Sequence, residues 1–114
     1  MYDLKKLKRV LPYPLRYVRA AALDMVGSVS EDATVCKEHW QLSGTVTVYG
    51  NESKIAVEIA PKDDSYSTLH IRMLEPSPKL SGDGQCRALA FLADGMEQLL
   101  ENTLAQANKK ERVI

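Results

Sequence analysis

The sequence predicts a two-layer α+β fold: an antiparallel meander sheet of three to four strands with two helices on one face. Apolar residues recur at helical spacing near the start of the chain and again over its last third. Between these stretches, β-branched and polar residues alternate with a period of two, which is typical of half-buried strands. A sheet with one apolar face must cover that face, and the two amphipathic helices are available to do so.

The chain begins with a basic segment, residues 1–12, that we expect to be peripheral, as a helical turn or a short edge strand. Pro12 and Pro14 follow, and a proline suits the first turn of a helix because no amide donor is needed there. The next apolar residues recur at helical spacing: Leu15, Val18, Ala22 and Val26. With Gly27 as the expected stop, the first helix is predicted near 14–26.

Alternation of apolar and polar residues predicts three strands, at 45–49, 54–59 and 68–73. A further strand is expected over 33–40, and Gly44 either separates it from the next strand or marks a bulge in one long bent strand. Matching the apolar faces requires an even loop, of two or four residues, between the first two of the three strands. The second hairpin requires an odd loop, and three or five residues around Lys62–Tyr66 supply one.

A long helix is predicted over about 84–107 at the end of the chain. Its apolar stripe consists of Leu89, Leu92, Ala93, Met96, Leu99, Leu100, Thr103 and Leu104. Asp83 is the expected N-cap, because its carboxylate suits the positive end of a helix. Gly95 inside this helix costs roughly 1 kcal/mol relative to alanine and permits close packing. The basic tail, 108–114, is expected to be peripheral.

The length of 114 residues favours a single domain over 1–114, with a core that needs no disulfide or metal. The order of helix, strands and long C-terminal helix is similar to that of small helix-grip and TATA-box-binding-like sheets. This resemblance concerns element order alone. No motif in the chain identifies a family, so the resemblance implies nothing about function.

The formal net charge of zero hides an uneven distribution. Residues 1–19 carry +5, residues 20–108 carry −7 and residues 109–112 carry +2. The basic start either docks on the chain's own acidic body or meets an anionic partner. Because the body is acidic, we expect no nucleic-acid partner.

Compartment is suggested only by absences in the sequence. The two cysteines, Cys36 and Cys86, are too few for a secreted disulfide scaffold, so we expect reduced thiols packed in the core. The chain shows no convincing signal peptide and no apolar run long enough to span a membrane. We therefore expect a cytoplasmic protein without an integral membrane segment.

The sequence contains no recognisable catalytic or metal-binding set. Cys36 and His39 are three residues apart, so a strand would place them on opposite faces, and we expect no metal site. Cys86 near a helix start is a candidate thiolate, but neither a base nor an oxyanion pocket accompanies it. We therefore expect no catalytic residue, no cofactor and no enzyme activity. Gly84 and Arg87 are weak anion-binding candidates, because helix N-terminal amides can hold an anion although Asp83 would repel it.

The polar face of the predicted sheet is the strongest functional candidate. It comprises Thr45, Thr47, Tyr49, Thr68, His70 and Arg72, all expected opposite the helices. Tyr49, Thr68, His70 and Arg72 are the candidate ligand or interface residues, since hydroxyls with His and Arg can recognise a carboxylate. Such a face is either solvated, paired with a partner or bound to a ligand. Trp40, the single tryptophan, is expected in the core.

The predicted function is self-association or partner binding without catalysis. A homodimer through the sheet face or edge is the expected form. The alternative is a small-ligand binding module with a cavity between the C-terminal helix and the sheet, where the few aromatics and many alanines leave room.

Overall fold

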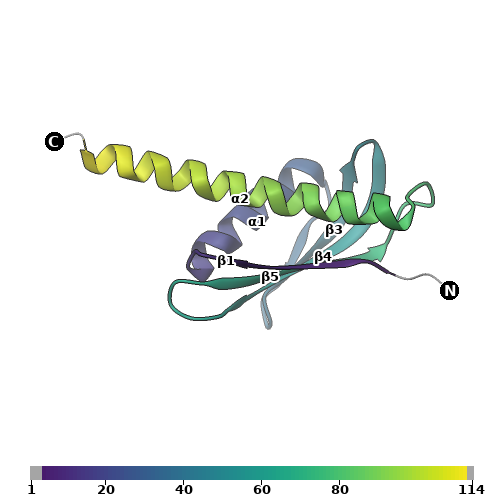
Figure 1. The fold of residues 1–114 in the computed structure, drawn as a ribbon. Helices are drawn as coiled ribbons and strands as arrows, with labels where there is room; N and C mark the ends of the chain where they lie inside the picture. Colours follow the sequence, from purple (N-terminus) through teal and green to yellow (C-terminus); the bar gives the residue numbers. More distant parts are fainter. Residues whose placement is uncertain (1–3, 113–114) are drawn as a thin grey trace.

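A computed structural model describes residues 4–112, with side chains described for residues 4–103. The elements in chain order are β1 (Lys6–Leu11), α1 (Leu15–Val29), β2 (Thr34–Cys36), β3 (Gln41–Val48), β4 (Asn51–Pro61), β5 (Ser67–Glu75) and α2 (Gly82–Arg112). The five strands form one antiparallel sheet in the order β1-β5-β4-β3-β2. Both helices pack on the same face of this sheet (Figure 1). The predicted two-layer α+β class is confirmed, with five strands rather than three to four.

The core lies between the two helices and the inner face of the sheet. Alternation directs odd-numbered residues of β4 and β5 and even-numbered residues of β3 inward, as predicted. The fully buried side chains include Leu42, Val46, Ile55, Leu69, Ile71 and Met73 from the sheet, with Val18, Val26, Leu89, Leu92 and Met96 from the helices. They form one hydrophobic cluster.

The two predicted hairpins have the predicted loop parity. Tyr49 and Gly50 form a two-residue turn between β3 and β4, and residues 62–66 form a five-residue loop between β4 and β5. Tyr49 and Gly50 both have positive φ, 52° and 77°. A type I′ turn requires positive φ at both central residues, and its twist matches that of the flanking strands.

The N-terminal segment supplies β1, the edge strand that pairs with β5. Leu11 at its end is 1% exposed and belongs to the core. Arg9 faces α2, where its Nη1 contacts Asp94 Oδ1 at 2.7 Å and Glu97 Oε2 at 2.6 Å. Lys6 and Lys8 alternate with Arg9 and are exposed on the other side of the strand. One part of the basic segment therefore docks on the acidic body, and another part faces solvent.

Gly27 and Gly44 do not end the elements where we expected. Gly27 lies inside α1, which continues to Val29. The predicted strand 33–40 is short, since β2 covers only Thr34–Cys36 and a turn follows it. Gly44 lies inside β3 in regular register with Ile55, so it neither separates two strands nor marks a bulge. The chain leaving α1 passes close to it: a Cβ there would lie 2.9 Å from both Ala33 Cα and Ser30 Oγ.

Helix α2 begins and ends outside the predicted bounds. Ser81, not Asp83, caps it, since Ser81 Oγ accepts a hydrogen bond from the Gly84 amide at 3.0 Å. Asp83 lies within the first turn, where its charge still suits the helix end. The helix runs to Arg112 and extends past the sheet (Figure 1). Gly95 faces α1, where an added Cβ would meet the sulfur of Met25.

Trp40 and the two cysteines lie at the periphery. Trp40 is partly buried against the core, and the Arg19 guanidinium stacks on its ring at 5.4 Å from the centroid. Cys36 and Cys86 are both exposed, so the expectation of packed thiols is wrong. Cys36 is on the short strand β2, and Cys86 is in the second turn of α2. Among the helices of the described residues, none is long and apolar enough to cross a membrane.

Candidate functional site

Four basic side chains gather on the outer face of the sheet, the face turned away from α1 and α2. In the register of β1 and β5, Lys6 lies opposite Arg72 and Lys8 lies opposite His70. All four residues are exposed. Residues directly opposite in an antiparallel pair share a face, so the four side chains form two neighbouring rungs. We call Lys6, Lys8, His70 and Arg72 the cationic ladder.

By itself, the cationic ladder lowers the stability of the fold. Like charges placed directly opposite across two strands are destabilising, and Lys6 faces Arg72 in this way. Glu58 on β4 partly offsets the charge, because its Oε1 contacts Arg72 Nη2 at 3.2 Å. The two side chains are 50% and 48% exposed, and an exposed ion pair contributes only about 0–1 kcal/mol. The ladder thus keeps an excess of positive charge that an external anion could neutralise.

The structure divides the predicted polar face between two strands and corrects one residue. Thr45 and Thr47 lie on β3, which β4 separates from β5. Thr68, His70 and Arg72 lie on β5 as predicted, with Thr68 partly buried. Tyr49 is not on this face: it lies in the turn and packs against Phe91 of α2, with ring centroids 5.4 Å apart. Alternation had placed Tyr49 on the strand, but β3 ends one residue earlier.

Lys6 and Lys8 were absent from the predicted site. The sequence does contain a pattern typical of a strand in this segment. Lys6, Lys8 and Val10 alternate there with Leu7, Arg9 and Leu11. Two prolines after the segment and its basic composition left a helical turn equally open. Only the pairing with β5 shows that these lysines join His70 and Arg72.

A cavity opens at the end of the ladder, where β5 leads into α2. It has a volume of about 440 Å³, and its lining is mainly apolar: Leu4, Leu74, Pro76, Pro78 and Leu80, with Glu75, Ser77 and Gln85. Pairing of β1 with β5 continues to this point, because the Met73 amide donates to the Lys5 carbonyl at 3.0 Å. Gln85 is buried, and its Oε1 accepts a hydrogen bond from the Lys5 amide at 3.3 Å.

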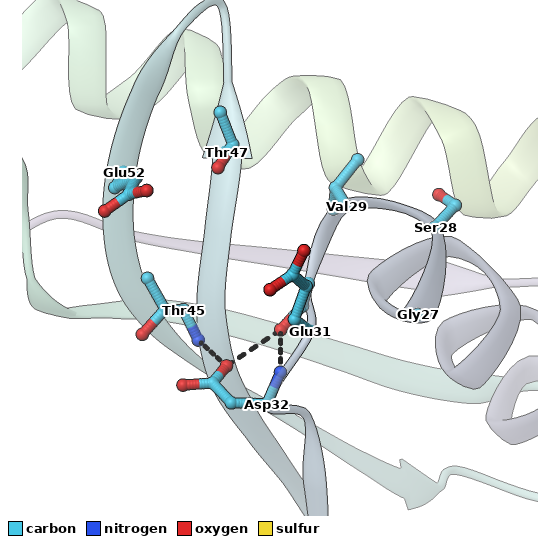
Figure 2. Close-up of a pocket in the computed structure, with 9 residues that line it drawn as sticks. Gly27, Ser28, Val29, Glu31, Asp32, Thr45, Thr47 and Glu52 are labelled. Carbon is cyan, nitrogen blue, oxygen red and sulfur yellow. Dashed lines mark hydrogen bonds between the residues drawn. The ribbon is translucent and has the colours of Figure 1, made fainter.

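A second cavity, of about 670 Å³, lies between the end of α1 and the edge of β3 (Figure 2). Its lining is polar and includes the carboxylates of Glu31, Asp32 and Glu52. Asp32 Oδ1 accepts hydrogen bonds from the Thr45 amide at 2.7 Å and from Ser30 Oγ at 3.0 Å (Figure 2). The backbone hydrogen bond from Thr45 is the main cause of a lowered pKa of Asp32, and the bond from Ser30 adds to it. Asp32 thereby satisfies the Thr45 amide on the side of β3 that the short strand β2 does not cover.

The predicted anion-binding residues of α2 have other contacts or are separate from the ladder. The Gly84 amide donates to Ser81 Oγ, as described above. Arg87 is exposed and lines a cavity of about 400 Å³ beside Tyr49, Phe91 and Met25. Anion binding by Gly84 and Arg87 stays a prediction.

Side chains of α2 that face the sheet are buried in the core where we expected a ligand cavity. Leu89, Leu92 and Met96 of α2 are 0–1% exposed, and they belong to one cluster with Ile71 and Met73. None of these five residues lines the cavities described above. Over the described residues, no group of three or more His, Cys, Asp or Glu side chains is placed to hold a metal ion.

Several solved structures are similar to this chain at low identity. A START superfamily protein from Mycobacterium smegmatis has 9% identity and a TM-score of 0.49, over 91% of this chain and 98% of that chain. A protein from Thermus thermophilus has 11% identity and a TM-score of 0.48, over 89% and 99%. The Zhui aromatase/cyclase from Streptomyces sp. R1128 has 12% identity and a TM-score of 0.39, over 97% and 98%. Scores at this level carry no argument about activity or residue roles. No family model and no curated protein matches the chain.

Proposed function

We propose that this domain acts by binding, without catalysis, and that the cationic ladder receives an anionic partner. The observation that carries the proposal is the placement of Lys6 directly opposite Arg72, and of Lys8 opposite His70, on one exposed face. The placement of Lys6 opposite Arg72 costs stability in the free protein. A bound anion would remove the cost and gain charge-assisted hydrogen bonds, which are the stronger ones in proteins.

The proposal is supported by the different contacts that the two sides of β1 make. Arg9 faces inward and is held by Asp94 and Glu97 of α2. Lys6 and Lys8 face outward, away from these carboxylates. The negative charge of the body therefore neutralises Arg9 and leaves the ladder available to a partner.

The proposal is tested by titrating the ¹⁵N-labelled protein with sodium phosphate at constant ionic strength. We expect saturable shifts in the amides of β1 and β5, and weaker binding at high salt because exposed charges are screened. Lys6→Glu reverses one ladder charge and should abolish the response. Lys62→Glu, in the loop between β4 and β5, is the matched control and should leave the response intact. Equal responses in the two variants would contradict the proposal.

Self-association through the sheet face remains the second candidate. The groove beside β3 carries Glu31, Asp32 and Glu52, so a second copy could present acidic groups to the ladder. Light scattering over a range of protein concentrations tests this candidate. A mass that rises with concentration, and no longer does so in the Lys6→Glu variant, would identify the anionic partner as a second copy. A constant monomer mass would exclude the homodimer.

A further inference from the structure

The outer face of β1 and β5 changes from charged to apolar along its length. Leu4 lies two residues before Lys6, just outside β1, and Leu74 lies two residues after Arg72, where the register of β5 with β4 shifts. The Met73 amide donates to the Lys5 carbonyl, so the two segments stay paired between these positions. Leu4 and Leu74 line the same cavity at the end of the ladder. A cationic pair, Lys6 and Arg72, therefore lies next to an apolar recess.

The recess has the size and composition of a small-molecule site. Its volume of about 440 Å³ falls within the range of roughly 300–1,000 Å³ typical of ligand pockets. Pro76 and Pro78 form part of its wall, and their fixed φ restricts the loop that encloses it. Gln85, 7% exposed, is a buried polar group of the same wall. Mostly apolar walls with a few placed polar groups are what a small ligand requires.

We infer that this cavity binds a small amphiphilic anion, with its apolar chain between Leu4 and Leu74 and its carboxylate or phosphate on Lys6 and Arg72. The inference rests on the proposed function, because the ladder supplies the anion contacts. Charge complementarity selects this occupant: an apolar neutral molecule would leave the two adjacent cations unused, and a small inorganic anion would leave the recess unused. The buried core residues Leu89, Leu92 and Met96 of α2 do not line this site.

Two carboxylates border the site and set the orientation of the ligand. Glu58 contacts Arg72 and would share it with the ligand or release it. Glu75 lines the cavity and lies opposite Lys54 of β4 in the register of the sheet. Repulsion by Glu75 should keep the anionic end of the ligand on the side of Lys6 and Arg72. Removal of this charge should therefore strengthen binding.

Octanoate is a suitable probe, because it carries a carboxylate on a flexible apolar chain. We would measure binding to the full chain by calorimetry and map it through backbone amide shifts. The comparison ligands are acetate, which lacks the chain, 1-octanol, which lacks the charge, and octylammonium, which reverses it. We expect octanoate to bind more tightly than each of the three, with shifts centred on Leu4, Arg72 and Leu74.

Matched variants separate the two halves of the site. Arg72→Met and Leu4→Ser should each weaken octanoate binding about tenfold, the effect of losing one charge-assisted contact or one apolar contact. Arg16→Met and Leu23→Ser replace an exposed arginine and an exposed leucine on α1, and should leave binding unchanged. Glu75→Gln should strengthen binding about twofold. Circular dichroism of each variant establishes that it is folded.

The outcomes distinguish failure of this inference from failure of the proposed function. If acetate binds as well as octanoate and only Arg72→Met weakens both, the ladder binds anions and the inference about the recess is wrong. If 1-octanol binds as well as octanoate and Arg72→Met changes neither this binding nor the phosphate titration, the ladder does not bind anions and both proposals are wrong. Binding to vesicles of anionic phospholipid without binding to octanoate would assign the ladder to a membrane surface and overturn the recess as a site.

Discussion

Gly27 and Gly44 show that the space around a glycine decides the consequence of replacing it. A Cβ at Gly44 would lie 2.9 Å from Ala33 Cα and 2.9 Å from Ser30 Oγ, and backbone atoms cannot easily yield. A Cβ at Gly27, on the exposed side of α1, would meet no atom within 4 Å. Gly44 therefore marks a close approach of two segments, whereas Gly27 only weakens a helix.

We predict opposite effects of alanine at these two positions. Gly44→Ala should lower the free energy of unfolding by about 1–3 kcal/mol, the usual cost of forcing extra atoms into a packed site. Gly27→Ala should raise it by about 0.5–1 kcal/mol, through better helix propensity and a less flexible unfolded chain. Urea denaturation of both variants measures the two effects. A stabilised Gly44→Ala variant would show that the segment after α1 does not pack on β3 as described.

Asp32 makes stability depend on pH through its hydrogen bond to the edge of β3. Its pKa is lowered from the ordinary value of 3.8 in the folded chain, mainly by the Thr45 amide. A carboxylate with a lowered folded-state pKa stabilises the fold above its unfolded pKa, and the contribution is lost as pH falls through the folded pKa. Asp32→Asn keeps an oxygen acceptor but loses the charge. We expect this variant to be less stable than the wild type at neutral pH and to approach it below about pH 4, in urea unfolding at several pH values.

Asp24→Asn is the matched substitution for this test, because Asp24 is exposed on α1 and lies outside the contacts of Asp32. A stability difference between wild type and Asp32→Asn that stayed constant from neutral to acid pH would exclude the charge of Asp32 as its cause.

At the scale of elements, residue patterns predicted which strands form but not where segments cross. Alternation in 54–59 and 68–73 was sufficient to predict which side chains of β4 and β5 face the core. A one-residue slip would move every apolar side chain of either strand to the wrong face. The turn was misplaced at both ends: alternation continued the first strand through Tyr49 and began the next at 54, whereas Tyr49 and Gly50 form the turn and β4 begins at Asn51. Gly44 could not be interpreted from sequence, since the segment that covers it is eleven residues away at Ala33.

Arg9 links β1 to α2, and we predict that this contact is electrostatic. Arg9 Nη1 touches both Asp94 and Glu97, and the hydrogen bond to Asp94 is the main cause of a raised pKa of Arg9. Arg9→Met should lower the free energy of unfolding by roughly 1 kcal/mol at low salt, and by less at high salt because of screening. It should also speed hydrogen exchange in β1.

The control for Arg9 lies on the same strand. Lys8→Met removes a cation that faces outward, opposite His70, so it should leave stability unchanged or slightly raise it. Equal destabilisation by Arg9→Met and Lys8→Met would mean that the inward and outward cations of β1 are equivalent, contrary to the structure.

Across the whole molecule, the zero net charge is the sum of separated surfaces. The sequence located the basic start and the acidic body, and it predicted that one could dock on the other. The sequence could not show which basic residues dock on the body and which face outward. That depends on the side of β1 that each residue faces once the strand pairs with β5. In the structure, Arg9 contacts Asp94 and Glu97 of α2, whereas Lys6 and Lys8 lie on the outer face of the sheet. The candidate site thus arises from pairing between segments about sixty residues apart, for which the sequence carried no local signal.

A single charge reversal should separate the binding role of the ladder from the stability of the molecule. In the Lys6→Glu variant a carboxylate faces Arg72, so an unfavourable cross-strand pair becomes a favourable one. We expect the free energy of unfolding to rise by about 0.2–1 kcal/mol while anion binding is lost. Urea denaturation and the phosphate titration measure the two quantities on the same samples, with Lys62→Glu as the control. A residue that only supports the fold would lose stability on reversal, so a destabilised Lys6→Glu variant would count against the ladder as a binding surface.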